Sequence, residues 1–325
     1  MTSTAPALRV GTRGSALALT QTTTVADALR AASGRDVELV RVTTTGDRST
    51  ASLSTLGGTG AFAAALRQAL LDGECDVAVH SLKDLPTAPS PGLSIAAVPP
   101  RADHRDALCA REGWTLDSLP RGARVGTGSP RRAAQLRLAR PDLDVQDIRG
   151  NVGTRLARVA PGDLDAVVLA RAGLERLDLL DPVTQTLAPE VMLPAPGQGA
   201  LAVECRTADL DELGPVMAEL EDVPTRWCVT AERAVLATLE AGCAAPVGTH
   251  ARTVAVDGGV QVSLHAAVVE PSGARRMERQ GAVVVPPSAS PVDGARVTAE
   301  LGARLAGELL ADGAAALADL PATSA

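Results

Sequence analysis

The chain of 325 residues is 46% hydrophobic and 21% charged, a composition typical of globular proteins and unlike that of disordered or fibrous chains. At about 150 residues per domain, this length predicts two or three domains. The net charge of -7 and a total of only three aromatic residues argue against a nucleic-acid-binding protein, which needs positive charge and stacking surfaces.

Arginine dominates the basic residues, and Lys83 is the only lysine in the chain. Genomic composition bias explains the arginines, but it leaves Lys83 as a position to watch. The five cysteines form no C-x-x-C pair, so neither a disulfide framework nor a zinc site is expected. We see no signal peptide and no apolar stretch of about 20 residues, and we expect a cytoplasmic protein that needs no metal and no membrane.

The first elements suggest an internal repeat. A strand at 8–10 leads through a glycine turn to a helix that Ser15 would cap, running to residue 29. The tetrapeptide Arg-Val-Gly-Thr at 9–12 recurs at 124–127, where Ser129 and Pro130 would begin the next helix. A second apolar strand follows each copy, at 76–79 and at 165–168. These matches suggest two related α/β halves.

Helices predicted at 62–71 and 131–138 alternate with these strands, which is the pattern of open sheets with crossover helices. Such sheets carry their ligand sites at the carboxyl ends of the strands. The Pro/Gly-rich run 194–199 predicts a linker, and a second break is expected near Arg101.

The pattern changes after Pro224. We expect a helix over 225–240 with Gly242 as its C′ residue, and then three strands at 249–256, 260–269 and 277–285 with a hairpin turn at 257–259. A closing helix is predicted over 292–310. This arrangement predicts a third domain of α+β type.

The segment 126–132 predicts an anion-binding site. A strand ends there in a turn of small residues, and the next helix offers free backbone N–H groups beside Arg131 and Arg132. The spacing is that of neither a phosphate loop nor a dinucleotide turn. The alternative is that both arginines point into solvent.

Further arginines strengthen this interpretation. Counted together, seven guanidiniums stand at loops or helix starts that the predicted topology brings to one side of two domains: Arg13, Arg131, Arg132, Arg149, Arg155, Arg171 and Arg176. Arginine pairs bidentately with carboxylates. A polycarboxylate ligand therefore fits better than a single phosphate.

Lys83 and Asp84 follow directly after the strand at 76–79, where an open sheet carries its site. The alternative is a surface ion pair of small energy. His80 is expected to pack as a strand histidine. Cys243 is expected on an exposed loop beyond a helix carboxyl end, which would raise its thiol pKa, so any reaction there needs a reactive electrophile. The other four cysteines are expected to be buried.

Six sequence blocks together resemble the porphobilinogen deaminase (hydroxymethylbilane synthase) family. They occur in the family's order between residue 9 and about residue 250 and are as follows: Thr12-Arg13-Gly14-Ser15, Val79-His80-Ser81-Leu82-Lys83-Asp84-Leu85-Pro86, Gly128-Ser129-Pro130-Arg131-Arg132, Arg149-Gly150-Asn151-Val152-Gly153-Thr154-Arg155, Leu193-Pro194-Ala195-Pro196-Gly197-Gln198-Gly199-Ala200 and Gly242-Cys243. The second and fourth blocks are the most specific.

The resemblance implies an α/β fold with two related open-sheet lobes similar to periplasmic binding proteins, plus a C-terminal α+β domain with a three-stranded antiparallel sheet. It implies a discontinuous first lobe (1–101 and 198–218), a second lobe (102–197) and a C-terminal domain (219–325). A monomer is the family expectation.

The resemblance also implies a transferase of porphyrin and haem (tetrapyrrole) biosynthesis. It would join four porphobilinogen molecules head to tail into hydroxymethylbilane, with release of ammonia, on a covalent dipyrromethane cofactor. By position, Cys243 resembles the thioether anchor and Asp84 the catalytic carboxylate. The remaining matched positions fall into two groups: cofactor binding at Lys83, Ser81, Ser129, Arg131, Arg132 and Arg155, and substrate binding at Arg13, Ser15, Arg149, Asn151, Arg176, Gln198 and Phe62.

One position departs from the family, because Thr59 stands where the family commonly has lysine. Phe62 matches the family's aromatic residue, but it could equally be a core anchor for its helix. Two other functions stay open at this point. One is a two-lobed carboxylate-binding module, which would have no need of Cys243, and the other is an inactive paralogue, for which Thr59 is the only support.

Overall fold

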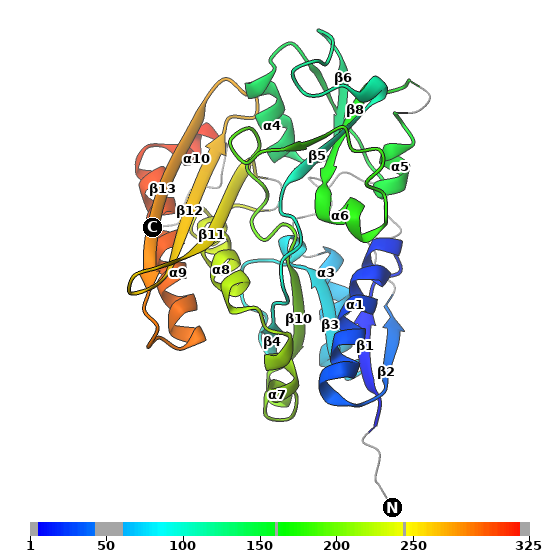
Figure 1. The fold of residues 1–325 in the computed structure, drawn as a ribbon, viewed down its shortest axis with the longest axis vertical. Coiled ribbons are helices and arrows are strands. Elements are labelled where there is room, and N and C mark those ends of the chain that lie inside the picture. Colours follow the sequence, from blue (N-terminus) through cyan, green and yellow to red (C-terminus); the bar gives the residue numbers. More distant parts are fainter. Residues whose placement is uncertain (1–5, 43–60, 160–161, 243–244, 319–325) are drawn as a thin grey trace, which may run out of the picture. The chain divides into compact units, whose positions relative to one another are not determined.

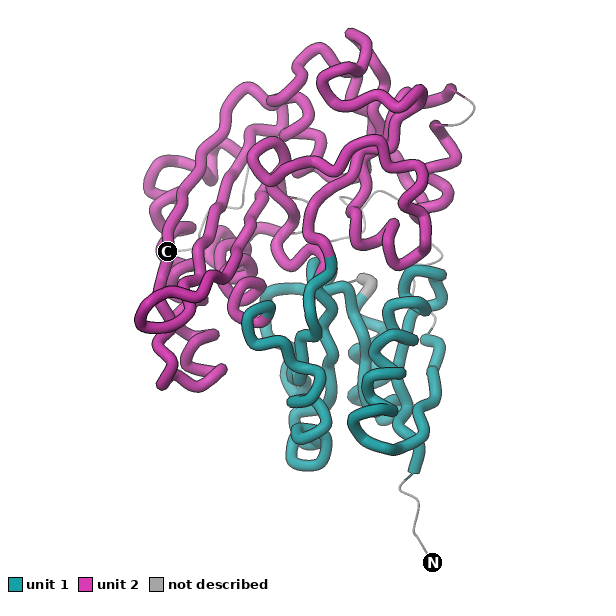
Figure 2. The backbone as a smooth tube through the Cα atoms, viewed as in Figure 1, with its two compact units in different colours: residues 1–102, 200–225 teal, residues 103–199, 226–325 magenta. Residues whose placement is uncertain are grey.

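The computed structural model describes residues 6–42, 61–159, 162–242 and 245–318. The chain divides into two compact units, one of residues 1–102 and 200–225 and the other of residues 103–199 and 226–325 (Figure 2). Within the described residues, no helix is long and apolar enough to cross a membrane.

The first unit is built on a five-stranded sheet in the order β2-β1-β3-β10-β4 (Figure 1). Its strands are β1 (Leu8–Thr12), β2 (Val37–Arg41), β3 (Val77–Ser81), β4 (Leu93–Ala97) and β10 (Leu201–Arg206). Its helices are α1 (Ala16–Ser33), α3 (Ala61–Leu71) and α7 (Leu210–Leu220). Alternation along β3 buries Val77 and Val79 with α1 and α7, and buries Ala78 on the opposite face with α3.

The second unit contains a five-stranded sheet in the order β7-β6-β8-β5-β9. Its strands are β5 (Asp106–Ala110), β6 (Arg124–Thr127), β7 (Asp144–Asp147), β8 (Ala166–Ala170) and β9 (Gln185–Leu187). Its helices are α4 (Pro130–Ala139), α5 (Val152–Leu156) and α6 (Arg171–Arg176). Leu136 of α4 packs on one face, whereas Leu174 of α6 packs on the other.

The repeated tetrapeptides occupy equivalent places in the two sheets. The Arg9 backbone N–H donates to Asp76 at 3.0 Å, and the Arg124 backbone N–H donates to Asp165 at 2.7 Å. In return, the N–H of each aspartate donates to the carbonyl of its arginine at 2.8 Å. The same side-chain and backbone pairing therefore joins neighbouring parallel strands in both halves, and the predicted α/β repeat is confirmed.

Glycine is required at the third position of each repeat. A Cβ added to Gly11 would lie 2.7 Å from Cys75 Sγ and from Leu66 Cδ1. A Cβ added to Gly126 would lie 2.6 Å from Leu164 Cδ1. Each glycine thus lets a side chain of the core pack directly against the strand.

The C-terminal part is an antiparallel sheet of β11 (Val247–Val256), β12 (Gly259–Val269) and β13 (Arg276–Val285), as predicted. Helices α9 (Pro291–Ala311) and α10 (Ala314–Leu317) pack on this sheet (Figure 1). Helix α8 (Val223–Thr238) approaches α9 closely at Gly302, where an added Cβ would lie 2.2 Å from the Ala231 carbonyl oxygen.

One sequence prediction needs correction. Glu240, with φ of 48°, is the left-handed residue beyond α8, so Gly242 is not the C′ residue. The Pro/Gly run 194–199, predicted to be a linker, ends where the chain passes between the two units at 199/200, and nearly all of its residues are buried in a turn. The Gly197 backbone N–H donates a hydrogen bond of 2.8 Å to the buried carboxylate of Glu232, which holds that turn.

Candidate functional site

In the first unit, Arg13 and Ser15 follow β1 at the carboxyl edge of the sheet. Ser15 caps α1, since its hydroxyl oxygen accepts a hydrogen bond of 3.3 Å from the Ala18 N–H. An accepting hydroxyl keeps its own hydrogen for donation. Arg13 is half-buried beside this helix start.

The turn after the neighbouring strand β3 presents Lys83 and Asp84. A single 3-10 turn, Leu82–Asp84, is anchored by the buried side chains of Leu82 and Leu85. Between these anchors Asp84 is exposed and Lys83 is half-buried. The hydroxyl of Ser81, the last residue of β3, donates to Gln21 Oε1 at 3.1 Å. Because β1 and β3 pair in parallel, these residues and Arg13 lie at one edge of the sheet.

In the second unit, Ser129 caps α4 as predicted, accepting from the Arg132 N–H at 3.5 Å. Arg131 and Arg132 then lie in the first turn of α4 with side chains that are only 3% and 7% exposed. The alternative in which they point into solvent is therefore wrong. Both guanidiniums bind Asp106, each at 2.8 Å.

Two more guanidiniums approach the same turn. A Cβ added to Gly128 would lie 3.7 Å from both Arg149 Nη1 and Arg155 Nη2, and 2.5 Å from the Ile148 carbonyl oxygen. Burial lowers the pKa of Arg155, and the charges of Arg132 and Arg149 lower it further. Like charges thus gather around a backbone that has no side chain at its closest point, which is how a protein accommodates an anion.

Asn151 orders the loop that carries Arg155 by capping helix α5. Its side-chain oxygen caps α5, accepting from the Thr154 N–H at 2.9 Å and from the Thr154 hydroxyl at 3.0 Å. Arg155 Nε donates to the Gly150 carbonyl at 2.8 Å. The glycine-rich loop is therefore closed on itself and fixes the direction of Arg155.

Gln198 belongs to the buried turn at 194–199, and Arg176 binds the same turn. Arg176 Nη2 donates to the Gly199 carbonyl at 2.7 Å, and burial lowers the pKa of Arg176. Gln198 is fully buried and donates to Asp106 Oδ1 at 2.8 Å. Arg171, in contrast, pairs with Asp103 at 2.9 Å and braces the start of this lobe.

The sequence analysis did not identify three buried carboxylates, those of Asp106, Glu204 and Glu232. Glu204 is bound by Arg67 at 2.8 Å and lies 3.2 Å from His80 Nε2. His80 is buried in β3 as predicted. The sequence does show Asp106 as a charged residue at the start of an apolar strand, but this pattern does not predict which residues pair with it.

Three positions named from the sequence cannot be placed. Cys243 and Thr59 lie outside the described residues, and so does the side chain of Phe62, the second residue of α3. The other four cysteines are buried as predicted. Burial raises the pKa of Cys75 to about 11 and that of Cys109 to about 12, so these thiols stay protonated.

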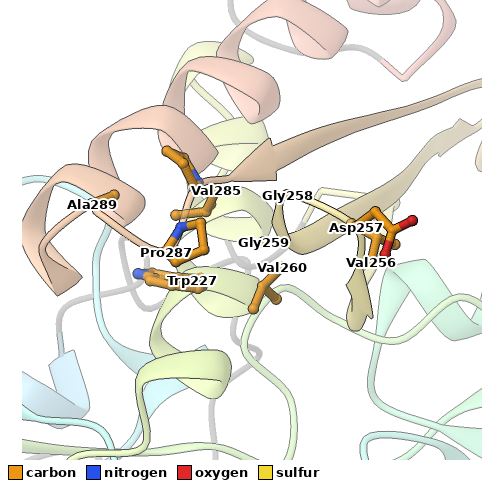
Figure 3. A pocket seen from close by; sticks show the side chains of 10 residues that line it. Trp227, Val256, Asp257, Gly258, Gly259, Val260, Val285, Pro287 and Ala289 are labelled. Carbon is orange, nitrogen blue, oxygen red and sulfur yellow. The ribbon is translucent and has the colours of Figure 1, made fainter.

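A pocket of about 430 Å³ lies in the C-terminal part, between the hairpin turn at 257–259 and Pro286–Pro287, with Trp227 as its aromatic wall (Figure 3). Asp257 is its only charged lining residue, and none of the predicted site residues lines it. Among the described residues, no cluster of His, Cys, Asp or Glu side chains could hold a metal ion.

Comparison with known proteins identifies the family. The family model described as porphobilinogen deaminase, dipyromethane cofactor binding domain, matches residues 8–213, and the one described as porphobilinogen deaminase, C-terminal domain, matches residues 227–311. The chain belongs to the porphobilinogen deaminase family. The expected enzymatic function and the dipyrromethane cofactor are confirmed by these matches.

Two relatives are similar in sequence to this chain over nearly its whole length. A porphobilinogen deaminase of Leifsonia xyli is 57% identical over 97% of this chain and 95% of its own length. One of Cutibacterium acnes is 54% identical over 98% of each chain. Among solved structures, a periplasmic substrate-binding protein of an ABC transporter from Coxiella burnetii is similar with a TM-score of 0.42 and 15% identity, covering 67% of this chain and 93% of that one.

Proposed function

We propose that this chain condenses porphobilinogen head to tail into hydroxymethylbilane, using Cys243 as the cofactor anchor and Asp84 as the catalytic carboxylate. One observation carries the assignment of the binding residues. Arg149 and Arg155 approach Gly128, and Arg131 and Arg132 begin α4 just after it, so four guanidiniums face only two paired carboxylates, the buried Asp106 and the exposed Asp147. Positive charge in excess at a partly buried site calls for an anionic ligand.

The residues present fit a dipyrromethane group, which carries four carboxylates. Arg131 Nε is buried, and no described residue accepts a hydrogen bond from it. Guanidinium pairs with carboxylate through two parallel hydrogen bonds, which suits the acetate and propionate side chains of pyrroles. When bound, the cofactor supplies the nucleophilic pyrrole carbon to which substrate is added. Ser129 can donate its hydroxyl hydrogen beside these arginines.

In the first unit, Asp84 would accept the pyrrole N–H of the substrate and stabilise the positive charge that develops as ammonia leaves. Its position supports this role, because the buried side chains of Leu82 and Leu85 fix the turn while the carboxylate itself stays exposed. Lys83, Arg13 and Ser15 would bind substrate or cofactor carboxylates at the same edge, and Ser81 would do so by turning its hydroxyl away from Gln21 Oε1. Arg176, Asn151, Gln198 and Phe62 would complete the substrate site.

We extend the proposal to domain organisation and setting. The division into 1–101 with 198–218, 102–197 and 219–325 is supported by β10, which pairs with β3 across Val203 and Val79. A cytoplasmic monomer that acts on a small molecule, without nucleic acid or membrane, is the setting we propose.

The intact mass of the purified chain tests the function directly. In a host that makes porphobilinogen, we expect a mass increase equal to two pyrrole units, lost in Cys243→Ser. Cys228→Ser is the matched control, because Cys228 is buried and should leave the adduct in place. A wild-type mass equal to that of the bare polypeptide would contradict the proposal.

A further inference from the structure

A buried carboxylate, Asp106, lies beneath the α4 arginines. It begins β5, and alternation along the strand places its side chain with Leu108 on the sheet face that α4 covers. Its Oδ2 accepts from Arg131 Nη2 at 2.8 Å. Its Oδ1 accepts from Arg132 Nε at 3.0 Å and from Arg132 Nη2 at 2.8 Å. Both carboxylate oxygens are thus engaged by guanidiniums.

Asp106 also binds a residue from a distant part of the chain. Gln198 Nε2 donates to Asp106 Oδ1 at 2.8 Å and to the His104 carbonyl at 2.8 Å. The chain passes between the two compact units at 102/103, 199/200 and 225/226 (Figure 2). Asp106 therefore joins α4 to residues that lie beside the first two of these passages.

The charges explain why the cluster needs this carboxylate. Burial and the charge of Arg132 lower the pKa of Arg131, whereas the charge of Asp106 raises it. Burial would raise the pKa of Asp106, but the charges of Arg131 and Arg132 outweigh it and hold that pKa at about 2. Asp106 is therefore ionised at neutral pH and opposes the repulsion between two neighbouring guanidiniums.

We propose that Asp106 is a positioning residue, which holds Arg131, Arg132 and Gln198 as one preassembled unit for binding pyrrole carboxylates. This inference rests on the proposed function. Asp106 itself is fully buried, and both of its oxygens are already bound by the two arginines. It acts by fixing which donors of the two guanidiniums face the ligand, so that little order has to be created on binding.

Two variants separate this role from a purely structural one. Asp106→Asn keeps the shape and removes the charge. Asp106→Glu keeps the charge and displaces the carboxylate by one methylene, so it remains informative if the first variant fails to fold. Asp163→Asn is the matched control, because Asp163 also pairs with an arginine of the same lobe, Arg158 at 2.6 Å, but its side chain is 49% exposed.

The measurements are intact mass for cofactor loading, thermal melting for the fold, and KM and kcat for porphobilinogen on the loaded fraction below each variant's melting midpoint. We expect KM to rise at least about tenfold in the folded Asp106 variants and to stay unchanged in Asp163→Asn. Folded variants that melt earlier but keep the wild-type KM and loading would reduce Asp106 to a structural role and overturn the inference. If the wild-type protein shows neither the adduct nor turnover, the proposed function is overturned, and this inference with it.

Discussion

The carboxylate of Glu232 accepts a hydrogen bond of 2.8 Å from the Gly197 backbone N–H, one residue before Gln198. Its other oxygen accepts from the Ala251 N–H of β11, also at 2.8 Å. Glu232 is 0% exposed on α8, the helix that leads toward Cys243. One buried side chain therefore joins the turn at 194–199, the C-terminal sheet and the helix before the proposed anchor.

Glu232→Gln should lower the stability of the second unit by about 1 to 3 kcal/mol, because an amide offers one acceptor oxygen to two buried N–H donors. Denaturant unfolding measures the loss. Glu212→Gln is the control, since Glu212 pairs with Arg35 at 2.9 Å but its side chain is 71% exposed, and its removal should cost less than about 1 kcal/mol. Equal effects of the two substitutions would contradict the prediction.

Asp84→Asn should lower turnover at least about 10²-fold, because it keeps the side-chain shape but removes the charge that opposes the developing cation. At an effective dielectric near 20, unit charges about 4 Å apart interact by ~4 kcal/mol, so partial charge in the transition state is worth ~2 to 4 kcal/mol. Single-turnover pyrrole addition by cofactor-loaded protein measures the effect.

Thermal melting is the control for this variant, and it should not change, since Asp84 is exposed. A single-turnover rate within about threefold of wild type would remove the electrostatic role and leave Asp84 as a surface residue beside Lys83.

Arg131→Leu should impair folding as well as cofactor loading. It leaves Asp106 with an uncompensated share of its buried charge, and it removes one of the two side-chain donors, Arg131 Nη1 and Gln135 Nε2, of the Leu193 carbonyl. Breaking a buried ion pair in this way costs about 3 to 5 kcal/mol. Arg158→Leu, which breaks an exposed pair, should cost less than about 1 kcal/mol in the same unfolding assay. A stable Arg131→Leu protein without adduct would place the role of Arg131 in ligand binding alone.

Acid should weaken the second unit through Asp106. The folded-state pKa of about 2 lies below the usual value of 3.8, so the unfolded chain binds the proton first as pH falls. The stabilisation is complete above about pH 4 and is lost as pH falls toward 2, with a total of about 2 kcal/mol. The difference in unfolding free energy between wild type and Asp106→Asn should shrink across this range. A difference independent of pH would show that the charge of Asp106 contributes nothing.

Gly128→Ala should disturb the guanidinium cluster, because the new Cβ would lie 2.5 Å from the Ile148 carbonyl oxygen, a backbone atom. The loop that carries Arg149 and Arg155 would have to move, so we expect at least about a tenfold rise in KM. Gly153→Ala is the control, since its nearest contact would be an ordinary 3.6 Å from Asn151 Oδ1. Equal KM values for the two variants would argue against convergence of the loops around Gly128.

The local elements could be predicted from the sequence because their signals lie within a few residues. Ser15 and Ser129 cap their helices three residues on, and the Arg-Val-Gly-Thr repeat marks equivalent strands. Motif order alone identified the family. The exception was also local. Glu240, rather than Gly242, adopts the left-handed conformation beyond α8.

The partners of the site arginines were decided only by the tertiary structure. Asp106 lies 25 residues from Arg131 and 92 residues from Gln198, and no periodicity links them. Whether an arginine in a first helical turn faces solvent or a carboxylate depends on which strand the sheet places beneath that helix. β5 runs beside β8 and under α4, so Asp106 is buried there, and the low dielectric around it makes pairing with both guanidiniums obligatory.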